Sequence, residues 1–182
     1  MGQADRWAGV NPEVTRGARA ALAALAACAL IGLTACDAQR VDKLEEGVST
    51  EVDVRKQFGD PVTVTLEPDG SRTMDYPRQP EGWTNYVILI GPDGKMSSLR
   101  QLLTPDNFAK VQPGLSQQQV RKLLGRPAKT VPYVLKSEDV WDWRFKQNGQ
   151  ESKVFSVSFA ADGKVVATAI SDDPRDTMSG SR

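Results

Sequence analysis

The sequence predicts an α+β protein of two tandem units, each made of two helices followed by three antiparallel strands. Three observations lead to this prediction. Motifs recur along the chain after about 67 residues, helix start and stop signals open each copy, and alternating apolar residues around an Asp-Gly turn close it. Helices on one face of a small antiparallel sheet leave only that face apolar, which this alternation fits.

The first 35 residues are expected to be a signal peptide. Arg16 and Arg19 precede an apolar stretch over 20–35, which is too short for an ordinary transmembrane helix and lacks the polar face of a surface helix. The stretch ends in Leu33-Thr34-Ala35-Cys36, which resembles the lipobox of bacterial lipoproteins. That resemblance implies cleavage between Ala35 and Cys36 and a covalent lipid on Cys36, so residues 36–40 are interpreted as a lipidated tether.

The first copy of the repeat is assigned to residues 41–103. Val41 and Leu44 are placed on a first short helix, and the segment Val54 to Pro61 ends a second helix at Gly-Asp-Pro. Three strands are expected to follow, at 72–76, 84–90 and 95–103, with Asp93-Gly94 as the turn between the last two.

The second copy, residues 104–170, repeats these features in the same order. Thr104 is an N-cap before Pro105, and Ser116 with Gln119 forms a capping box for a helix that stops at Gly125-Arg126-Pro127. Strands are expected at 140–145, 154–159 and 164–170, with a turn at Asp162-Gly163. Residues 171–182 are rich in Ser, Asp and Gly and are expected to form a disordered tail.

The composition excludes several classes of function. The chain has no histidine and only two cysteines, Cys28 and Cys36, so His-based catalytic triads, Cys- or His-rich metal sites and a disulfide framework are excluded. Its 23 basic and 23 acidic residues balance, which gives no sign of nucleic-acid binding. Ser49 and Ser116 are interpreted as helix caps and not as nucleophiles, because no histidine is present to activate them. We therefore expect a protein that is not an enzyme. We also expect no metal and no cofactor beyond the lipid.

Paired features in the two copies resemble a known family. Gly, a hydrophobic residue, Ser, Val and Gly-x-Pro occur in that order in both copies, followed by an aromatic strand and an Asp-Gly-Lys turn. This pattern, over about residues 41–170, resembles the SmpA/OmlA (BamE-like) lipoproteins, and tandem units of this shape also resemble β-lactamase inhibitory protein.

The resemblance implies a lipid-anchored envelope protein that faces the periplasm and binds envelope proteins. Such a protein would be an accessory to outer-membrane protein assembly or envelope integrity. The alternative, an inhibitor or substrate-binding module unrelated to assembly, stays open. The family favours the outer membrane, whereas Asp37 after the lipid cysteine is similar to the inner-membrane retention signal of enterobacterial lipoproteins.

Two groups of residues are candidates for contacts. Trp141 and Trp143 alternate regularly and are predicted to be core, with Asp142 on the opposite sheet face, paired with Arg144 or a cross-strand neighbour. The irregular loop from Pro77 to Trp83 carries Arg78 and Trp83, which are candidate partner-binding residues. Trp83 is either an exposed anchor or a lid on the first sheet, and both interpretations stay open. The acidic pairs Glu45-Glu46 and Asp172-Asp173 are interpreted as solvated surface.

Overall fold

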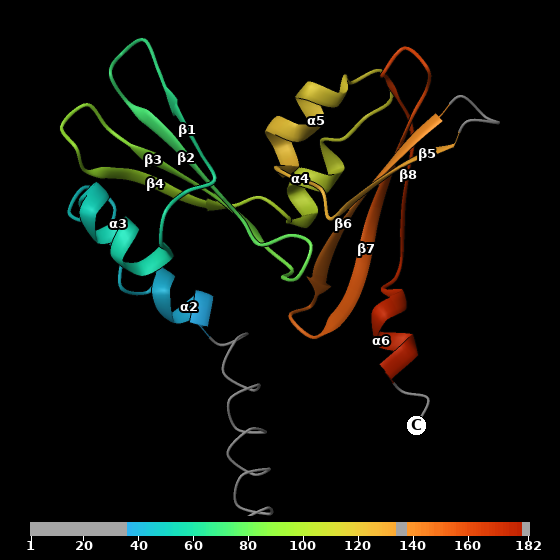
Figure 1. Ribbon diagram of the computed structural model, residues 1–182, viewed down its shortest axis with the longest axis horizontal. Coiled ribbons are helices and arrows are strands. Elements are labelled where there is room, and N and C mark those ends of the chain that lie inside the picture. Colours follow the sequence, from blue (N-terminus) through green and yellow to red (C-terminus); the bar gives the residue numbers. More distant parts are fainter. Residues whose placement is uncertain (1–35, 134–137, 180–182) are drawn as a thin grey trace, which may run out of the picture. The chain divides into compact units, whose positions relative to one another are not determined.

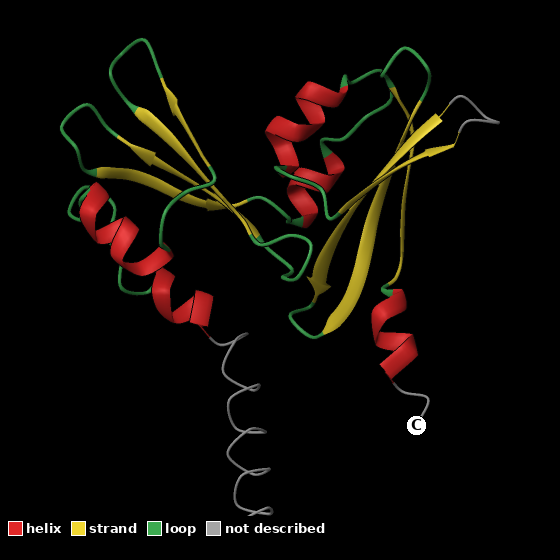
Figure 2. Ribbon diagram, in the orientation of Figure 1, coloured by secondary structure: helices red, strands yellow, loops and turns green. Residues whose placement is uncertain are grey.

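The computed structural model describes residues 36–133 and 138–179 (Figure 1). The chain divides between residues 39 and 40, and both sheets belong to the second unit. This unit has the predicted α+β composition, with helices and two antiparallel sheets of four strands each (Figure 2). Among the described residues, no helix has both the length and the apolar character needed to cross a membrane. The predicted signal peptide, residues 1–35 with Ala35 at its end, lies outside the described residues.

The first half begins with helices α2 (Cys36–Val41) and α3 (Glu51–Phe58). Residues 36–40, expected to be a tether, therefore lie in a helix. The strands that follow pair in chain order: β1 (Thr63–Leu66), β2 (Arg72–Pro77), β3 (Asn85–Ile90) and β4 (Met96–Gln101). Val54 and Phe58 of α3 pack on the buried side chains of one sheet face, which include Met74, Tyr76, Ile88 and Ile90.

The second half has the same order of elements. It begins with helices α4 (Pro105–Ala109) and α5 (Gln117–Leu124), and its strands again pair in chain order: β5 (Lys129–Tyr133), β6 (Glu138–Gln147), β7 (Glu151–Phe159) and β8 (Val165–Asp172). A short helix, α6 (Pro174–Ser179), ends the described chain. The core joins Val120 and Leu124 of α5 to an aromatic sheet face, and Trp143 and Phe159 are fully buried there.

Helices α3 and α5 begin and end alike. Each starts at a reciprocal capping box, Thr50 with Asp53 and Ser116 with Gln119. Each ends at a glycine whose carbonyl accepts a hydrogen bond from an aromatic side chain of the sheet, 3.2 Å in both cases. The donors are the Tyr76 hydroxyl to Gly59 and the Trp143 indole to Gly125. The helix end is thus joined to its sheet in the same way in both halves.

The N-cap of α3 differs from our expectation. Thr50, and not Ser49, caps the helix. The Ser49 side chain is buried and its hydroxyl instead accepts a hydrogen bond from the backbone N–H of Glu45, at 2.9 Å. The capping role predicted for Ser116 and the N-cap predicted for Thr104 are confirmed.

Each sheet has four strands where three were expected. The additional strands, β1 and β5, are first in their sheets, and each is hydrogen bonded to one neighbour only. All four residues of β1 are exposed, and β5 contains Pro132, which cannot donate to a ladder. Edge strands with so little burial lack the apolar alternation on which the prediction depended.

The expected disordered tail is also corrected. Residues 171 and 172 belong to β8, and α6 follows at Pro174–Ser179. Asp173, assigned to solvated surface, is 1% exposed and pairs with Arg144. Its backbone N–H also donates to the Ser152 carbonyl at 3.1 Å. These bonds hold the segment to the sheet although its composition is polar.

The predicted core of the second half is confirmed. Trp143 is fully buried, and Trp141 packs beside it, with its ring centroid 4.9 Å from that of Phe159. Asp142 lies on the opposite face, where its carboxylate accepts a hydrogen bond from the cross-strand Ser156 hydroxyl at 2.6 Å. Of the two partners considered for Asp142, the structure shows the cross-strand neighbour.

Candidate binding groove

A groove of about 670 Å³ lies between the open face of the first sheet and helix α5. Its floor carries the side chains that alternate with the buried ones. Val64 is opposite the fully buried Met74, so the neighbouring pairs Thr63 with Asp75 and Thr65 with Thr73 turn to the other face. The floor is therefore polar, with three threonine hydroxyls and two carboxylates, Asp75 and Glu67, and the Thr73 hydroxyl donates to the Glu67 carboxylate at 3.3 Å.

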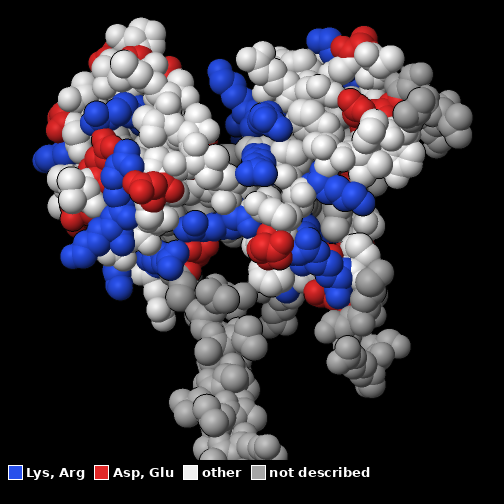
Figure 3. Space-filling model, in the orientation of Figure 1, with Lys and Arg blue, Asp and Glu red and all other residues white. Residues whose placement is uncertain are grey.

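The wall of the groove is basic. Because Val120 and Leu124 are buried in the second core, the exposed side of α5 presents Arg121 and Lys122, and Arg126 follows in the turn. The guanidinium carbon of Arg121 lies 5.3 Å from the centroid of the Trp141 ring, a cation–π contact that orients the side chain. Basic side chains gather on the surface over α5 (Figure 3).

The floor holds an acid without a partner. Among the described residues, none forms a hydrogen bond or ion pair with the Asp75 carboxylate. Partial burial raises the pKa of Asp75 above its usual range, because the charged form loses solvation in the groove. Asp75 is thus available to accept hydrogen bonds from a bound molecule.

Asn85, at the start of β3, closes one end of the groove. It is 1% exposed, and its amide donates to the Leu124 carbonyl at 2.7 Å and to the Arg126 carbonyl at 2.9 Å. Leu124 is the last residue of α5, where no further helical turn would bind its carbonyl, and Arg126 lies in the turn that follows. Gly125 has a φ of 73°, which favours glycine, and a Cβ atom there would also crowd the Asn85 amide at 3.1 Å.

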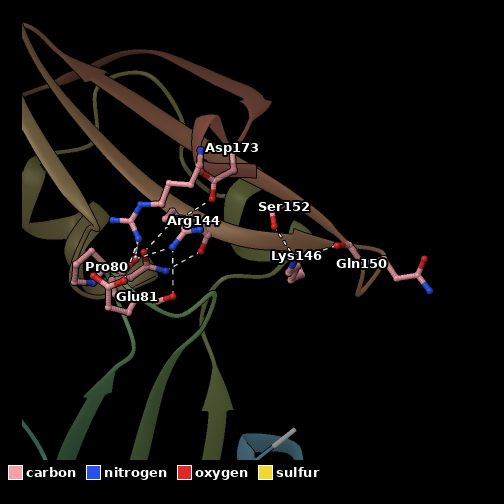
Figure 4. A network of polar contacts seen from close by, with 9 residues as sticks. Pro80, Glu81, Arg144, Lys146, Gln150, Ser152 and Asp173 are labelled. Carbon is pink, nitrogen blue, oxygen red and sulfur yellow. Dashed lines mark hydrogen bonds and ion pairs between the residues drawn. The ribbon is translucent and has the colours of Figure 1, made fainter. Parts of the chain in front are cut away.

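A polar clasp joins the loop after β2, residues 78–84, to strand β6 of the second half (Figure 4). The Gln79 side chain pairs with the backbone of Arg144, donating to its carbonyl at 2.7 Å and accepting from its N–H at 3.3 Å. The Arg144 guanidinium donates to the carbonyls of Pro80, at 2.9 Å, and Glu81, at 3.3 Å, and pairs with Asp173. Arg144 is only 7% exposed, so the clasp is a buried ionic network.

The candidate residues Trp83 and Arg78 lie at this junction. The Trp83 ring is half-buried under two cations of β6, with the Lys146 ammonium 4.4 Å and the Arg144 guanidinium carbon 5.3 Å from its centroid. It is therefore neither an exposed anchor nor a lid on the first sheet. The Arg78 guanidinium carbon lies 5.5 Å from the Phe58 ring in the first core. These contacts hold both side chains in place, and their role in binding a partner stays a prediction.

Sequence reasoning missed the residues that build this junction. Asn85, Gln79 and Asp173 are polar residues buried by contacts 29 to 65 residues away along the chain. The available signal was Asn85 itself, a residue that is uncommon in strands, at the first position of the apolar strand β3. Across the described residues, no three Cys, His, Asp or Glu side chains converge to hold a metal ion.

The comparisons with known proteins identify a domain in the second half. Residues 101–169 match the model of the outer membrane protein assembly factor BamE domain, and this confirms the family resemblance for that segment. No curated protein matches the sequence.

Three solved structures are similar to parts of the chain. A structure assigned as the osmotically inducible lipoprotein OsmE is 25% identical, covers 43% of this chain and 90% of its own, and has a TM-score of 0.35. The DUF4309 family protein YjgB from Bacillus subtilis is 17% identical, covers 71% of this chain and 82% of its own, and has a TM-score of 0.28. A Streptococcus mutans protein assigned as a β-lactamase inhibitor is 11% identical, covers 74% of this chain and 93% of its own, and has a TM-score of 0.30.

Proposed function

We propose, from the BamE domain at residues 101–169, that this protein is a membrane-anchored periplasmic lipoprotein that binds envelope proteins and assists outer-membrane protein assembly. The family match is the observation that carries this proposal. The groove supports a binding role, because hydroxyls, two carboxylates and three cations, from strands β1 and β2, helix α5 and the turns after β1 and α5, face one concave surface. In this proposal the protein acts by recognition and catalyses no reaction.

We propose further that residues 41–103 are a second BamE-like unit. Its support is the matched order of two helices and four antiparallel strands in both halves. The paired capping boxes add to it, as do the bonds from Tyr76 to Gly59 and from Trp143 to Gly125. A duplication explains why each half has its own core.

The anchor is proposed to be a lipid on Cys36, exposed by cleavage after Ala35. The sequence supports it, since the lipobox-like tetrapeptide ends an apolar stretch of signal-peptide length. Two acyl chains on one cysteine suffice for stable anchoring. Mass spectrometry of the mature N-terminus should find a diacylated Cys36, and an uncleaved chain with a free thiol would contradict the anchor.

Deletion of the protein from its own cells tests the assembly role. We expect less folded outer-membrane β-barrel protein, measured by heat-modifiable mobility on gels, and recovery when the full chain is restored. A Cys36→Ser chain, which cannot be lipidated, should not restore it. Unchanged barrel levels in the deletion strain would contradict the proposal.

A further inference from the structure

One segment of the chain carries a net excess of positive charge. Residues 107–137 contain no Asp or Glu, although the whole chain has as many acids as bases. Six basic residues fall in this segment: Lys110, Arg121, Lys122, Arg126, Lys129 and Lys136. Three of the six line the groove. The basic wall of the groove is thus formed by a segment that carries an excess of positive charge.

Within the part of the chain that the structure describes, the cations of the wall have no acidic partners. Arg121, Lys122 and Arg126 are exposed, and none of them forms an ion pair with a described residue. On α3, outside the groove, Arg55 by contrast pairs with Glu51 and Asp60 at 2.8 Å. Three unpaired cations on one wall attract a ligand that carries several negative charges.

The shape of the site restricts this ligand. A volume of about 670 Å³ is in the range that encloses a small ligand or a short chain segment, and the concave form does not suit a flat membrane surface. The threonines of the floor can exchange hydrogen bonds with a backbone. Both properties favour a polypeptide in extended form.

The rim of the groove offers a place for such a chain. Strand β1 is an edge strand, paired on one side only, all four of its residues are exposed, and Thr63 and Thr65 line the groove. It carries neither a proline nor a charged residue that would block the addition of another strand. An extended peptide can add to an edge of this kind through main-chain hydrogen bonds.

We propose that the groove binds an extended acidic segment of a partner protein. The backbone of the segment lies along β1, and its carboxylates reach Arg121, Lys122 and Arg126. This inference rests on the proposed protein-binding function and names the chemical class of the partner. Charge complementarity between an acidic chain and an unpaired basic wall selects this occupant.

A fluorescence-anisotropy titration tests the proposal with the full chain in non-ionic detergent. The probe is a dye-labelled peptide of alternating Glu and Thr, roughly ten residues long, about the span of a strand with its flanks. The reference probe has Gln in place of Glu. We expect the Glu peptide to bind at least about tenfold more tightly, and added salt to reduce this difference.

Matched variants locate the binding site. Arg121→Gln, Lys122→Gln and Arg126→Gln together should weaken binding of the Glu peptide by about tenfold or more. The control set, Lys43→Gln, Lys56→Gln and Lys95→Gln, removes the same charge from exposed positions outside the groove and should change it less than about twofold. Should the triple variant melt early, the pair without Arg121 replaces it, because Arg121 also contacts Trp141.

Several results would overturn the proposal. Equal affinity for the Glu and Gln peptides would do so, as would equal loss in the two variant sets. Binding of anionic phospholipid vesicles that competes with the peptide and is lost in the triple variant would assign the wall to a lipid surface. A dimer that only the triple variant fails to form would assign it to a second copy of the chain. The assembly role fails separately, through unchanged barrel levels in the deletion strain.

Discussion

Replacing Asp173 by Ala removes one partner of the buried ion pair that secures the clasp. Asp173 is 1% exposed and Arg144 is 7% exposed. Without the carboxylate, the positive charge of Arg144 therefore stays buried. Loss of one partner from a buried pair costs about 3–5 kcal/mol. Arg144 keeps the carbonyls of Pro80 and Glu81 as acceptors, which places the expected cost near about 3 kcal/mol. For a domain of this size, the melting temperature should fall by about 6–12 °C.

Urea and thermal unfolding of the full chain measure this cost. Asp172→Ala is the matched control, because Asp172 is the adjacent residue and forms an exposed ion pair with Lys153, so its loss should move the melting temperature little. Replacing both partners together, Arg144→Met with Asp173→Leu, should restore most of the stability, since no charge is then left buried. If Asp173→Ala unfolds like Asp172→Ala, the buried pair does not hold the junction.

Three further predictions concern the core, the loop and the groove. Leu124→Ala should cost about 2–5 kcal/mol of unfolding free energy in urea titrations, because the side chain is fully buried, and a neutral result would place it at the surface. Trp83→Ala should cost about 1–2 kcal/mol through its two cation contacts, whereas Trp83→Phe, which keeps a ring and removes a buried N–H without a partner, should be nearly neutral; equal losses would refute this. Burial raises the pKa of Asp75 above its ordinary value of 3.8. The protonated Asp75 therefore contributes fully to the stability of the folded state below pH 3.8, and this contribution is lost as the pH rises through the pKa of the folded state. Asp75→Asn should therefore gain stability over the wild type as the pH rises from 3.8, and a difference that does not vary with pH would contradict it.

Local signals predicted the elements that carry them. The capping box at Ser116, the stop at Gly125 and the alternation through Trp143 each act within a few residues, and each was confirmed. The same holds for the Asp-Gly turns, since both glycines have a positive φ in the structure, Gly94 at 79° and Gly163 at 75°. These features depend on neighbours along the chain, which the sequence contains.

Features that depend on distant contacts could not be predicted in the same way. Strand β1 is exposed at every residue, so it has no buried face to produce alternation. Asp173 looks solvated in its polar segment and is buried only because Arg144, 29 residues earlier, pairs with it. The groove likewise needs the first sheet and α5 together, and no single segment carries its pattern.

The corrected position of Trp83 changes the expected contact surface. Sequence alternatives placed this residue at the surface or over the first sheet, whereas its ring contacts the second half. Two independent cation contacts and the Gln79 pairing explain the loop as a junction. The groove is the surface on which we propose that a partner binds, and a contact at Trp83 stays a separate prediction.

Site-specific photo-crosslinking in living cells tests the central claim, that the protein acts by binding a protein partner in the groove. A photoreactive amino acid would replace Gln118 on the wall, Thr65 on the floor and, as the control, the exposed Lys56 outside the groove. We predict a crosslinked protein adduct from Gln118 and Thr65 and none from Lys56. Adducts from Lys56 alone, or no adduct from either groove position while the chain is folded and present, would contradict the account.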